Sequence, residues 1–318
     1  MTTFTKGLHD LGNGVFAYLQ PDGSWGWSNA GLIADGDQTL LIDTLFDTNL
    51  TADMLAAMRD AVPAAARIDR LVNTHANGDH CWGNELVEGA EIIASKSSAE
   101  EMEEVPAEML NQMMQAAPGM RAQGMGDLGD YLLRIFGPFD FAGIKPTLPT
   151  RTFERELSLT VGDKTVDLIE VGPAHTRGDV LVHVPSDRTV FTGDILFIEG
   201  HPIMWAGPVA NWIEACERIM AMDVETIVPG HGPITDKAGV KAVRDYLTYI
   251  AIEARKRYDA GLGVMEAAQD IALDDYSSWG EAERIVVNVD TLYREFSGRD
   301  EPVDIVGLFS MMAKLAKP

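Results

Sequence analysis

Four side chains that can bind a metal ion lie within one stretch of six residues: His75, Asn77, Asp79 and His80. The stretch follows the apolar run Leu71-Val72, which we interpret as the end of a buried strand, and a helix is expected from about Trp82. Imidazole nitrogens and a carboxylate so close together can converge on one cation, and zinc and iron both accept such ligands. The plainer alternative is a polar turn whose histidines only cap a helix.

Three further metal-capable residues follow strand-like runs later in the chain: His175, Asp194 and His231. Each lies in a glycine-containing loop after an apolar run, which is how a rigid sheet presents functional side chains. Together with the first cluster, they favour a metal centre over a structural turn.

These motifs make the sequence similar to the metallo-β-lactamase superfamily. Its signature is His-x-His-x-Asp-His, followed by a lone His, a Thr-Gly-Asp and a late Gly-His, and the matches span residues 70–232 in that order. The resemblance implies that Asp79, His80 and His231 bind one metal and that Asp194 bridges two. It also implies that His75 and His175 are two of the three nitrogen ligands of the other metal.

One position departs from that signature, because Asn77 stands where the family has its second histidine. An amide oxygen is a weaker donor to zinc than an imidazole nitrogen. We therefore expect the site built on His75 and His175 to be weak or empty. The alternative is that Asn77 coordinates through its oxygen and both sites fill.

Composition narrows the class of protein. The 318 residues are 46% hydrophobic, which supports a sizeable core, and their net charge is −24. That charge disfavours nucleic acid or an anionic membrane surface as a partner.

No apolar run approaches the length of a membrane span and the N-terminus has no apolar signal core, so a cytoplasmic location is expected. Cys81 and Cys216 do not suggest a disulfide framework.

Short apolar runs and helical patterns alternate along both halves of the chain. In the first half, strands are expected over 15–19, 30–34, 39–43, 68–72 and 91–95, with a helix over 49–61. The second half carries strands over 157–161, 166–171, 180–184 and 189–191. Four helices then follow, over 237–260, 264–271, 279–296 and 304–315.

The resemblance and the two strand-rich halves together predict an α/β fold, an αββα sandwich of two mixed sheets with outer helices, over residues 1–236. A Met-rich helical insert at about 97–140 is added to it, together with a helical extension over 237–318. The insert is interpreted either as a mobile lid over the site or as a helical hairpin packed on the core. The extension is expected to pack on the sandwich or to form a homodimer.

Four other residues are candidates for contact with a small-molecule substrate. Trp25 and Trp27 lie in a glycine-containing loop where a core role is hard to explain, and the resembling family has its active site beside this region. His201 and Trp205 follow Asp194 closely enough to reach the pocket.

The expected function is metal-dependent hydrolysis of a small carbonyl substrate: an ester, lactone, thioester or β-lactam. A bound metal, one or two zinc ions or alternatively iron or manganese, lowers the pKa of water toward neutrality. Asp79 and Asp194 are the expected catalytic carboxylates, and Thr74 and Thr192 are candidates to orient the ligands. Two alternatives remain, a mononuclear iron oxygenase or redox enzyme on the same fold, and a binding protein without activity.

Overall fold

Twelve strands form two sheets in a computed structural model that describes residues 3–299 and 301–316. The first sheet has seven strands in sequence order. They are β1 (Gly7–Gly12), β2 (Val15–Leu19), β3 (Ala30–Asp35), β4 (Gln38–Ile42), β5 (Arg70–Val72), β6 (Glu91–Ser95) and β7 (Arg151–Phe153). The strands β1 to β4 form an antiparallel meander, and β4 to β7 are parallel.

The second sheet has five strands in the order β12-β11-β10-β9-β8. They are β8 (Glu156–Val161), β9 (Lys164–Glu170), β10 (Val180–Val184), β11 (Thr189–Phe191) and β12 (Thr226–Val228). Only the β11–β12 pair is parallel. Both sheets are therefore mixed, as predicted.

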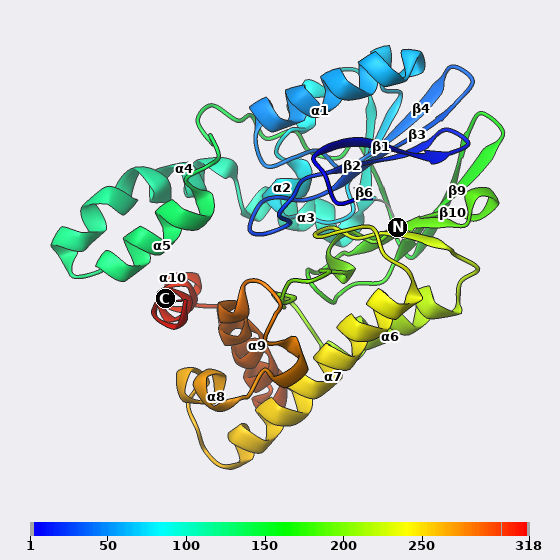
Figure 1. Cartoon of the computed structure of the whole chain (residues 1–318). Coiled ribbons are helices and arrows are strands. Elements are labelled where there is room, and N and C mark those ends of the chain that lie inside the picture. Colours follow the sequence, from blue (N-terminus) through cyan, green and yellow to red (C-terminus); the bar gives the residue numbers. More distant parts are fainter. Residues whose placement is uncertain (1–2, 300, 317–318) are drawn as a thin grey trace.

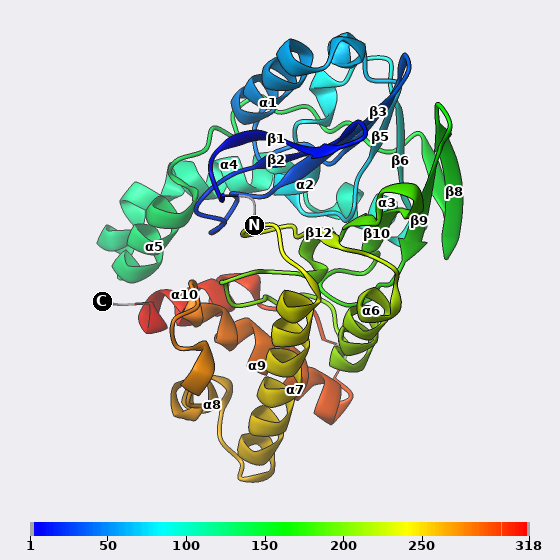
Figure 2. The same cartoon turned by 45° about the vertical axis from the view of Figure 1, so that its right-hand side comes forward.

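Alternation of side chains along the strands separates the layers of the core. In β3, Ile33 packs in the cluster between the two sheets, whereas the next residue back, Leu32, packs against the outer helix α1 (Thr48–Ala61). On the other sheet, Leu181 faces a cluster that contains α6 (Val209–Ala221) and α7 (Lys237–Asp259). Helices thus cover the outer faces of both sheets, which confirms the predicted αββα sandwich (Figures 1 and 2).

The expected insert is helical and forms α3 (Lys96–Glu104), α4 (Ala107–Ala116) and α5 (Gly126–Phe136). One face of α5, including Leu132 and Phe136, belongs to the largest core cluster, together with Leu308 and Phe309 of α10 (Ile305–Leu315). This packing supports a docked hairpin rather than a free lid for α5, whereas α4 stays largely exposed.

The C-terminal residues form the four expected helices: α7, α8 (Val264–Asp270), α9 (Ile285–Ser297) and α10. The helix α9 begins six residues later than the pattern predicts, because Glu281 has a left-handed φ of 55° and Gly280 bridges to Gly200. The helices bury their apolar faces within this chain. A homodimer through them stays a prediction.

Two strands, β1 and β7, were not expected from the sequence. The helix expected from Trp82 instead begins at Gly78, as α2 (Gly78–Cys81), so Asp79 and His80 lie on its first turn rather than before it. No helix in the described part of the chain has both the length and the apolar character that crossing a bilayer requires.

Candidate metal centre

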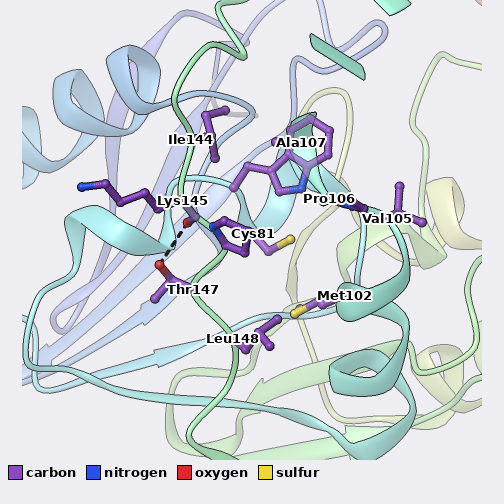
Figure 3. A pocket seen from close by; sticks show the side chains of 11 residues that line it. Cys81, Met102, Val105, Pro106, Ala107, Ile144, Lys145, Thr147 and Leu148 are labelled. Atoms are coloured by element: carbon purple, nitrogen blue, oxygen red, sulfur yellow. Dashed lines mark hydrogen bonds between the residues drawn. The ribbon is translucent and has the colours of Figure 1, made fainter. Parts of the chain in front are cut away.

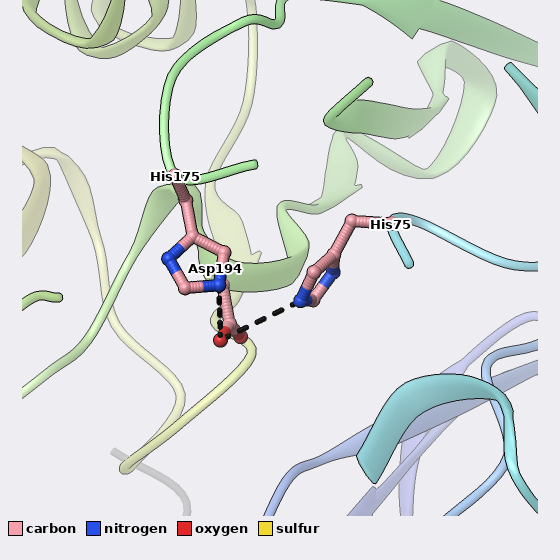
Figure 4. A group of neighbouring side chains, drawn as sticks. All are labelled: His75, His175 and Asp194. Carbon is pink, nitrogen blue, oxygen red and sulfur yellow. Dashed lines mark ion pairs between the residues drawn. The ribbon is translucent and has the colours of Figure 1, made fainter. Parts of the chain in front are cut away.

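Six of the seven metal-capable residues form two groups of three, all buried. One group is His75, His175 and Asp194, and the other is Asp79, His80 and His231; within each, the candidate ligand atoms all lie within 4.8 Å of one another. Figure 4 shows the imidazoles of His75 and His175 converging on the Asp194 carboxylate from different segments. The sequence motifs therefore meet at one place in the fold.

The strands place these ligands by a shared rule. His75, Asp194 and His231 each lie three residues beyond the last residue of a strand, namely β5, β11 and β12. All three strands end at the edge of the sandwich where the centre lies, so loops of the first sheet and of the second sheet contribute ligands to it.

Two of the histidines are oriented by backbone carbonyls. Nδ1 of His175 lies 2.6 Å from the carbonyl of Ile203, and Nδ1 of His231 lies 3.0 Å from that of Gly23. A carbonyl oxygen only accepts hydrogen bonds, so Nδ1 must carry the proton in both rings. The lone pair of Nε2 is then left for a metal ion, which is the usual arrangement of a metal-binding histidine.

Asp43 orients the other two histidines, and sequence reasoning did not identify it. Its Oδ2 lies 2.8 Å from Nδ1 of His80 and 2.7 Å from the hydroxyl of Thr74, which in turn lies 3.0 Å from Nδ1 of His75. Asp43 has a left-handed φ of 62° and is only 2% exposed. The signal in the sequence was a carboxylate at the end of the apolar run Leu40-Leu-Ile. The other threonine candidate, Thr192, bonds backbone carbonyls instead.

Charges in the cluster change the effect of burial on each pKa. Burial alone would raise the pKa of Asp194, but His231, His80 and His75 hold it well below its usual range. Burial, reinforced by the charge of His80, lowers the pKa of His75 well below the ordinary value for histidine. Burial also lowers the pKa of His175. Burial alone would also lower the pKa of His80 and of His231, but Asp194 and the neighbouring carboxylates raise the pKa of His80 well above the ordinary value for histidine and that of His231 to about 9. Metal binding needs an ionised carboxylate and neutral imidazoles, so a metal ion would displace the protons of these two rings.

Three buried atoms of the cluster make no well-formed hydrogen bond among the described residues: Nε2 of His75, and Nε2 of His80 and Oδ1 of Asp194, which face each other at 3.1 Å. Leaving buried polar atoms unpaired costs free energy, on the order of 1–3 kcal/mol each. A divalent cation among them would satisfy all three, so the residues present fit a metal ion.

Asn77 also faces this cluster. It is the N-cap residue of α2, yet its side chain makes no capping hydrogen bond. Instead, its amide nitrogen Nδ2 lies 3.0 Å from Nε2 of His175. The residue that stands in place of the second histidine of the family signature therefore contacts a candidate ligand directly.

The four substrate candidates lie in different surroundings. The ring of Trp25 contacts Phe136 and Phe309, each at 5.8 Å between centroids, and the ring of Trp205 lies 6.3 Å from Phe309. The amide of Trp205 also donates to the carbonyl of His175. The ring of Trp27 packs 4.9 Å from Phe139.

His201 does not have the role expected of it. Its Nε2 donates to the carbonyl of Tyr276 at 3.2 Å, and its Nδ1 accepts from the hydroxyl of Tyr246 at 3.0 Å. The ring is fully buried, and both nitrogens are occupied. We therefore correct the expectation of substrate contact: His201 ties the loop after Asp194 to the C-terminal helices.

Cys81, which directly follows His80, lines a small cavity (Figure 3). Its volume is about 20 Å³, enough for roughly one water molecule, and its lining includes Trp82, Met102 and Leu148. Burial raises the pKa of the Cys81 thiol well above its usual value. Cys81 is thus a buried apolar residue, and this cavity is too small for a substrate.

Comparison with known proteins agrees with this arrangement. The family model of the metallo-beta-lactamase superfamily matches residues 23–231. A hydroxyacylglutathione hydrolase of Rhizobium meliloti (strain 1021) is 26% identical over 166 residues, which are 51% of this chain and 47% of that protein. One of Maricaulis maris (strain MCS10) is 24% identical over 198 residues, 60% of this chain and 56% of that protein. The chain spans about half the length of these curated relatives.

Solved structures show the same fold. A metallo-beta-lactamase from Pontibacter korlensis aligns with a TM-score of 0.55 at 17% identity, over 76% of this chain and 98% of its own. A sec-alkylsulfatase from Pseudomonas sp. aligns with a TM-score of 0.64 at 15% identity, over 94% of this chain and 52% of its own.

Proposed function

We propose that this chain, which belongs to the metallo-β-lactamase superfamily, is a metal-dependent hydrolase of a small carbonyl substrate. An ester, lactone, thioester or β-lactam fits this chemistry, and the thioester ranks first because curated relatives are named hydroxyacylglutathione hydrolases. The observation that carries the proposal is the convergence of six buried ligand residues from separate loops. A small-molecule substrate, rather than nucleic acid or a membrane, also agrees with the net charge of −24.

The two candidate ligand sets differ in how fully they match the family signature. Asp79, His80 and His231 would hold one metal ion with a complete set of family ligands. His75, His175 and Asp194 would hold a second, with Asn77 in place of the missing histidine. A metal ion bound there would supply Lewis acidity, which polarises a carbonyl and makes hydroxide available near neutral pH. Zinc is the first candidate, and iron and manganese accept similar ligands.

Asp194 is suited to link the two groups. Its Oδ2 lies 3.3 Å from Nε2 of His175 and 3.5 Å from Nε2 of His231, and its Oδ1 lies 3.1 Å from Nε2 of His80. One carboxylate thus faces ligands of both groups. Asp194 would therefore help to hold a metal ion at either group.

Asp79 is suited to act on the nucleophile. Its side chain is 12% exposed, whereas those of His80 and His231 are 0% and 4% exposed, so it is the part of this group most open to solvent. The charges of His80 and His231 outweigh burial and lower its pKa, which keeps it ionised. An ionised carboxylate at the open side can accept a hydrogen bond from water and orient it.

The test combines metal analysis with a substrate panel. Purified protein is assayed for zinc, iron and manganese, and then for hydrolysis of an aryl ester, a lactone, an S-acyl thioester and a β-lactam, with and without chelator. We expect hydrolysis of the thioester or another panel member that chelator abolishes and added metal restores. The matched variant Asp79→Asn should lose turnover.

Two results would contradict the proposal. Metal-loaded protein that turns over nothing in the panel would favour a binding protein. Oxygen consumption with bound iron would favour the oxygenase or redox alternative.

A further inference from the structure

Arg284 is a buried cation with few partners. It ends the short helix η7 (Ala282–Arg284) before α9 and is only 1% exposed. A guanidinium carries five N–H donors, yet within the described residues it makes one hydrogen bond, from Nη1 to the carbonyl of His201 at 3.0 Å. Its Nε has no partner there, and the carboxylate of Glu281 is 4.0 Å away. Burying a charge so incompletely paired is unfavourable.

Aromatic rings surround the guanidinium and connect it to the metal centre. Its Cζ lies 4.5 Å from the ring centroid of Trp25 and 5.2 Å from that of Phe197. The Phe197 ring stacks on the imidazole of His231 at 5.1 Å, with an interplanar angle of 5°. One aromatic ring therefore contacts both Arg284 and a candidate metal ligand.

Trp25 supplies a second donor without an acceptor. Its Nε1 is buried and has no hydrogen-bond partner among the described residues, although the residue as a whole is partly exposed. The loop that carries it is tied to the metal centre, because the carbonyl of Gly23 accepts from His231. Trp25 thus links the buried guanidinium to the solvent side of this region.

A purely structural role explains part of this arrangement. Cation–π contacts with Trp25 and Phe197 stabilise the buried charge. They give no acceptor to Nε of Arg284 or to Nε1 of Trp25. A negatively charged ligand would complete both donors and neutralise the charge.

We propose that Arg284 and Trp25 bind an anionic group of the substrate, so that preferred substrates are small carbonyl compounds bearing a carboxylate. That the bound anion belongs to a substrate rests on the proposed hydrolase function. The anion site itself does not depend on that function. The apolar neighbours of Trp25, Phe136 and Phe309, would contact the uncharged part of such a molecule. The C-terminal extension would then supply a specificity-determining residue.

The test measures binding rather than turnover. Metal-loaded protein is titrated with benzenesulfonate and with methyl phenyl sulfone, an uncharged molecule of similar shape, and tryptophan fluorescence and calorimetry report binding. A sulfonate is used because it binds metal poorly, so its affinity reports on the guanidinium. We expect at least 10-fold tighter binding of the sulfonate, because a charged hydrogen bond contributes about 1.5–3 kcal/mol, roughly 10- to 100-fold.

Variants test whether Arg284 and Trp25 cause the preference for the sulfonate. Arg284→Gln should weaken sulfonate binding about 10- to 100-fold and leave the sulfone unchanged. Trp25→Phe removes one donor but keeps a ring over the guanidinium, and should cost less. The control is Arg255→Gln: Arg255 also lies over two rings, those of Tyr258 and Phe296, but its side chain is half exposed. It should bind like the parent.

Equal binding of sulfonate and sulfone by the parent protein would overturn the inference, even if Arg284→Gln fails to fold. Equal affinities of folded Arg284→Gln and folded Arg255→Gln for the sulfonate would also overturn it. Should Arg284→Gln not fold, Arg284→Lys keeps the charge but loses the fork of donors, and its sulfonate affinity should lie below that of the parent. Sulfonate binding that depends on Arg284 without hydrolysis of any panel substrate would refute the proposed function and support the anion site.

Discussion

The amide nitrogen of Asn77 lies 3.0 Å from Nε2 of His175, the atom of that histidine that is free to bind metal. An N–H donated to that lone pair competes directly with a metal ion. To contribute to coordination, the amide must turn and offer its oxygen, a weaker donor than imidazole. We therefore expect Asn77 to weaken the second site.

This relationship predicts one tightly bound ion per chain. The parent protein should hold a second zinc ion only substoichiometrically, whereas Asn77→His should bind it at least 10-fold more tightly. Zinc titration with a competing chelator measures both affinities. Asn111→His on α4 controls for adventitious binding by an added imidazole. Two tightly held ions in the parent would show that Asn77 coordinates well.

A second prediction concerns Asp43, which receives hydrogen bonds from His80 and Thr74. Asp43→Asn should lower metal affinity about 10- to 100-fold, because His80 loses the partner that orients it. Asp69→Asn is the matched control. Asp43 accepts from the backbone amide of Thr74. Asp69 accepts likewise from that of Thr39, but it contacts none of the metal-capable residues. Equal metal affinities in the two variants, by chelator competition, would disprove the role of Asp43.

Removing a ligand from the complete set of Asp79, His80 and His231 should reduce activity more than replacing Asp43. His231→Ala should abolish hydrolysis and lower the metal content, while the circular dichroism spectrum of the fold persists. The imidazole of His231 is one of the three candidate ligands in the group with Asp79 and His80, and alanine has no atom that can bind a metal ion. Full activity in His231→Ala would refute the assigned ligand set.

His201 predicts a pH dependence of stability. Burial lowers its pKa to about 4, below the value near 6.5 of an unfolded histidine. The folded state therefore resists protonation: the stabilisation is fully present above pH 6.5 and is lost as the pH falls toward 4. It amounts to about 3 kcal/mol.

The measurement compares the parent with His201→Gln. Free energies of unfolding are measured in denaturant between pH 7 and pH 4, on protein with the same metal content. We expect the parent to lose about 3 kcal/mol more than the variant over this range. Parallel pH profiles would mean that His201 is protonated without penalty.

Phe309 provides a test of the contact between α10 and the insert. It is 8% exposed and contacts the rings of Trp25, Phe136 and Trp205. Phe309→Ala should lower the free energy of unfolding by about 3 kcal/mol. Val306→Ala on the exposed side of the same helix should change it little. Similar losses in both variants would argue against a packed role for Phe309.

Regular strands and ligand motifs were predictable because their signals are local. The meander of β2, β3 and β4 shows in short apolar runs divided by turns, and the ligands that follow β5, β11 and β12 show in loops after such runs. Short strands at the margins carry weaker signals. Arg151–Phe153 has only three residues, two of them exposed, so it looks like connecting chain until it pairs with β6.

The roles of Asp43, Arg284 and His201 were not predictable, because each depends on contacts between distant segments. Asp43 reaches His80 through the packing of two strands, and Arg284 meets Trp25 across more than two hundred residues of chain. No spacing in the sequence encodes such contacts. His201 shows the converse, since its closeness in sequence to Asp194 suggested a role that its hydrogen bonds exclude.

The docking of α5 on α10 has a consequence for how the chain is made. The apolar face around Leu132 and Phe136 leaves the ribosome before the second sheet, and its partner Phe309 follows only after that sheet and the helices α6 to α9. At about 5–20 residues per second, this face waits on the order of ten seconds for its cover. During that interval Trp25 and Phe46 can already contact Phe136, but the part of this face that α10 covers stays exposed on the nascent chain. That part is where chaperones that bind apolar surfaces would act.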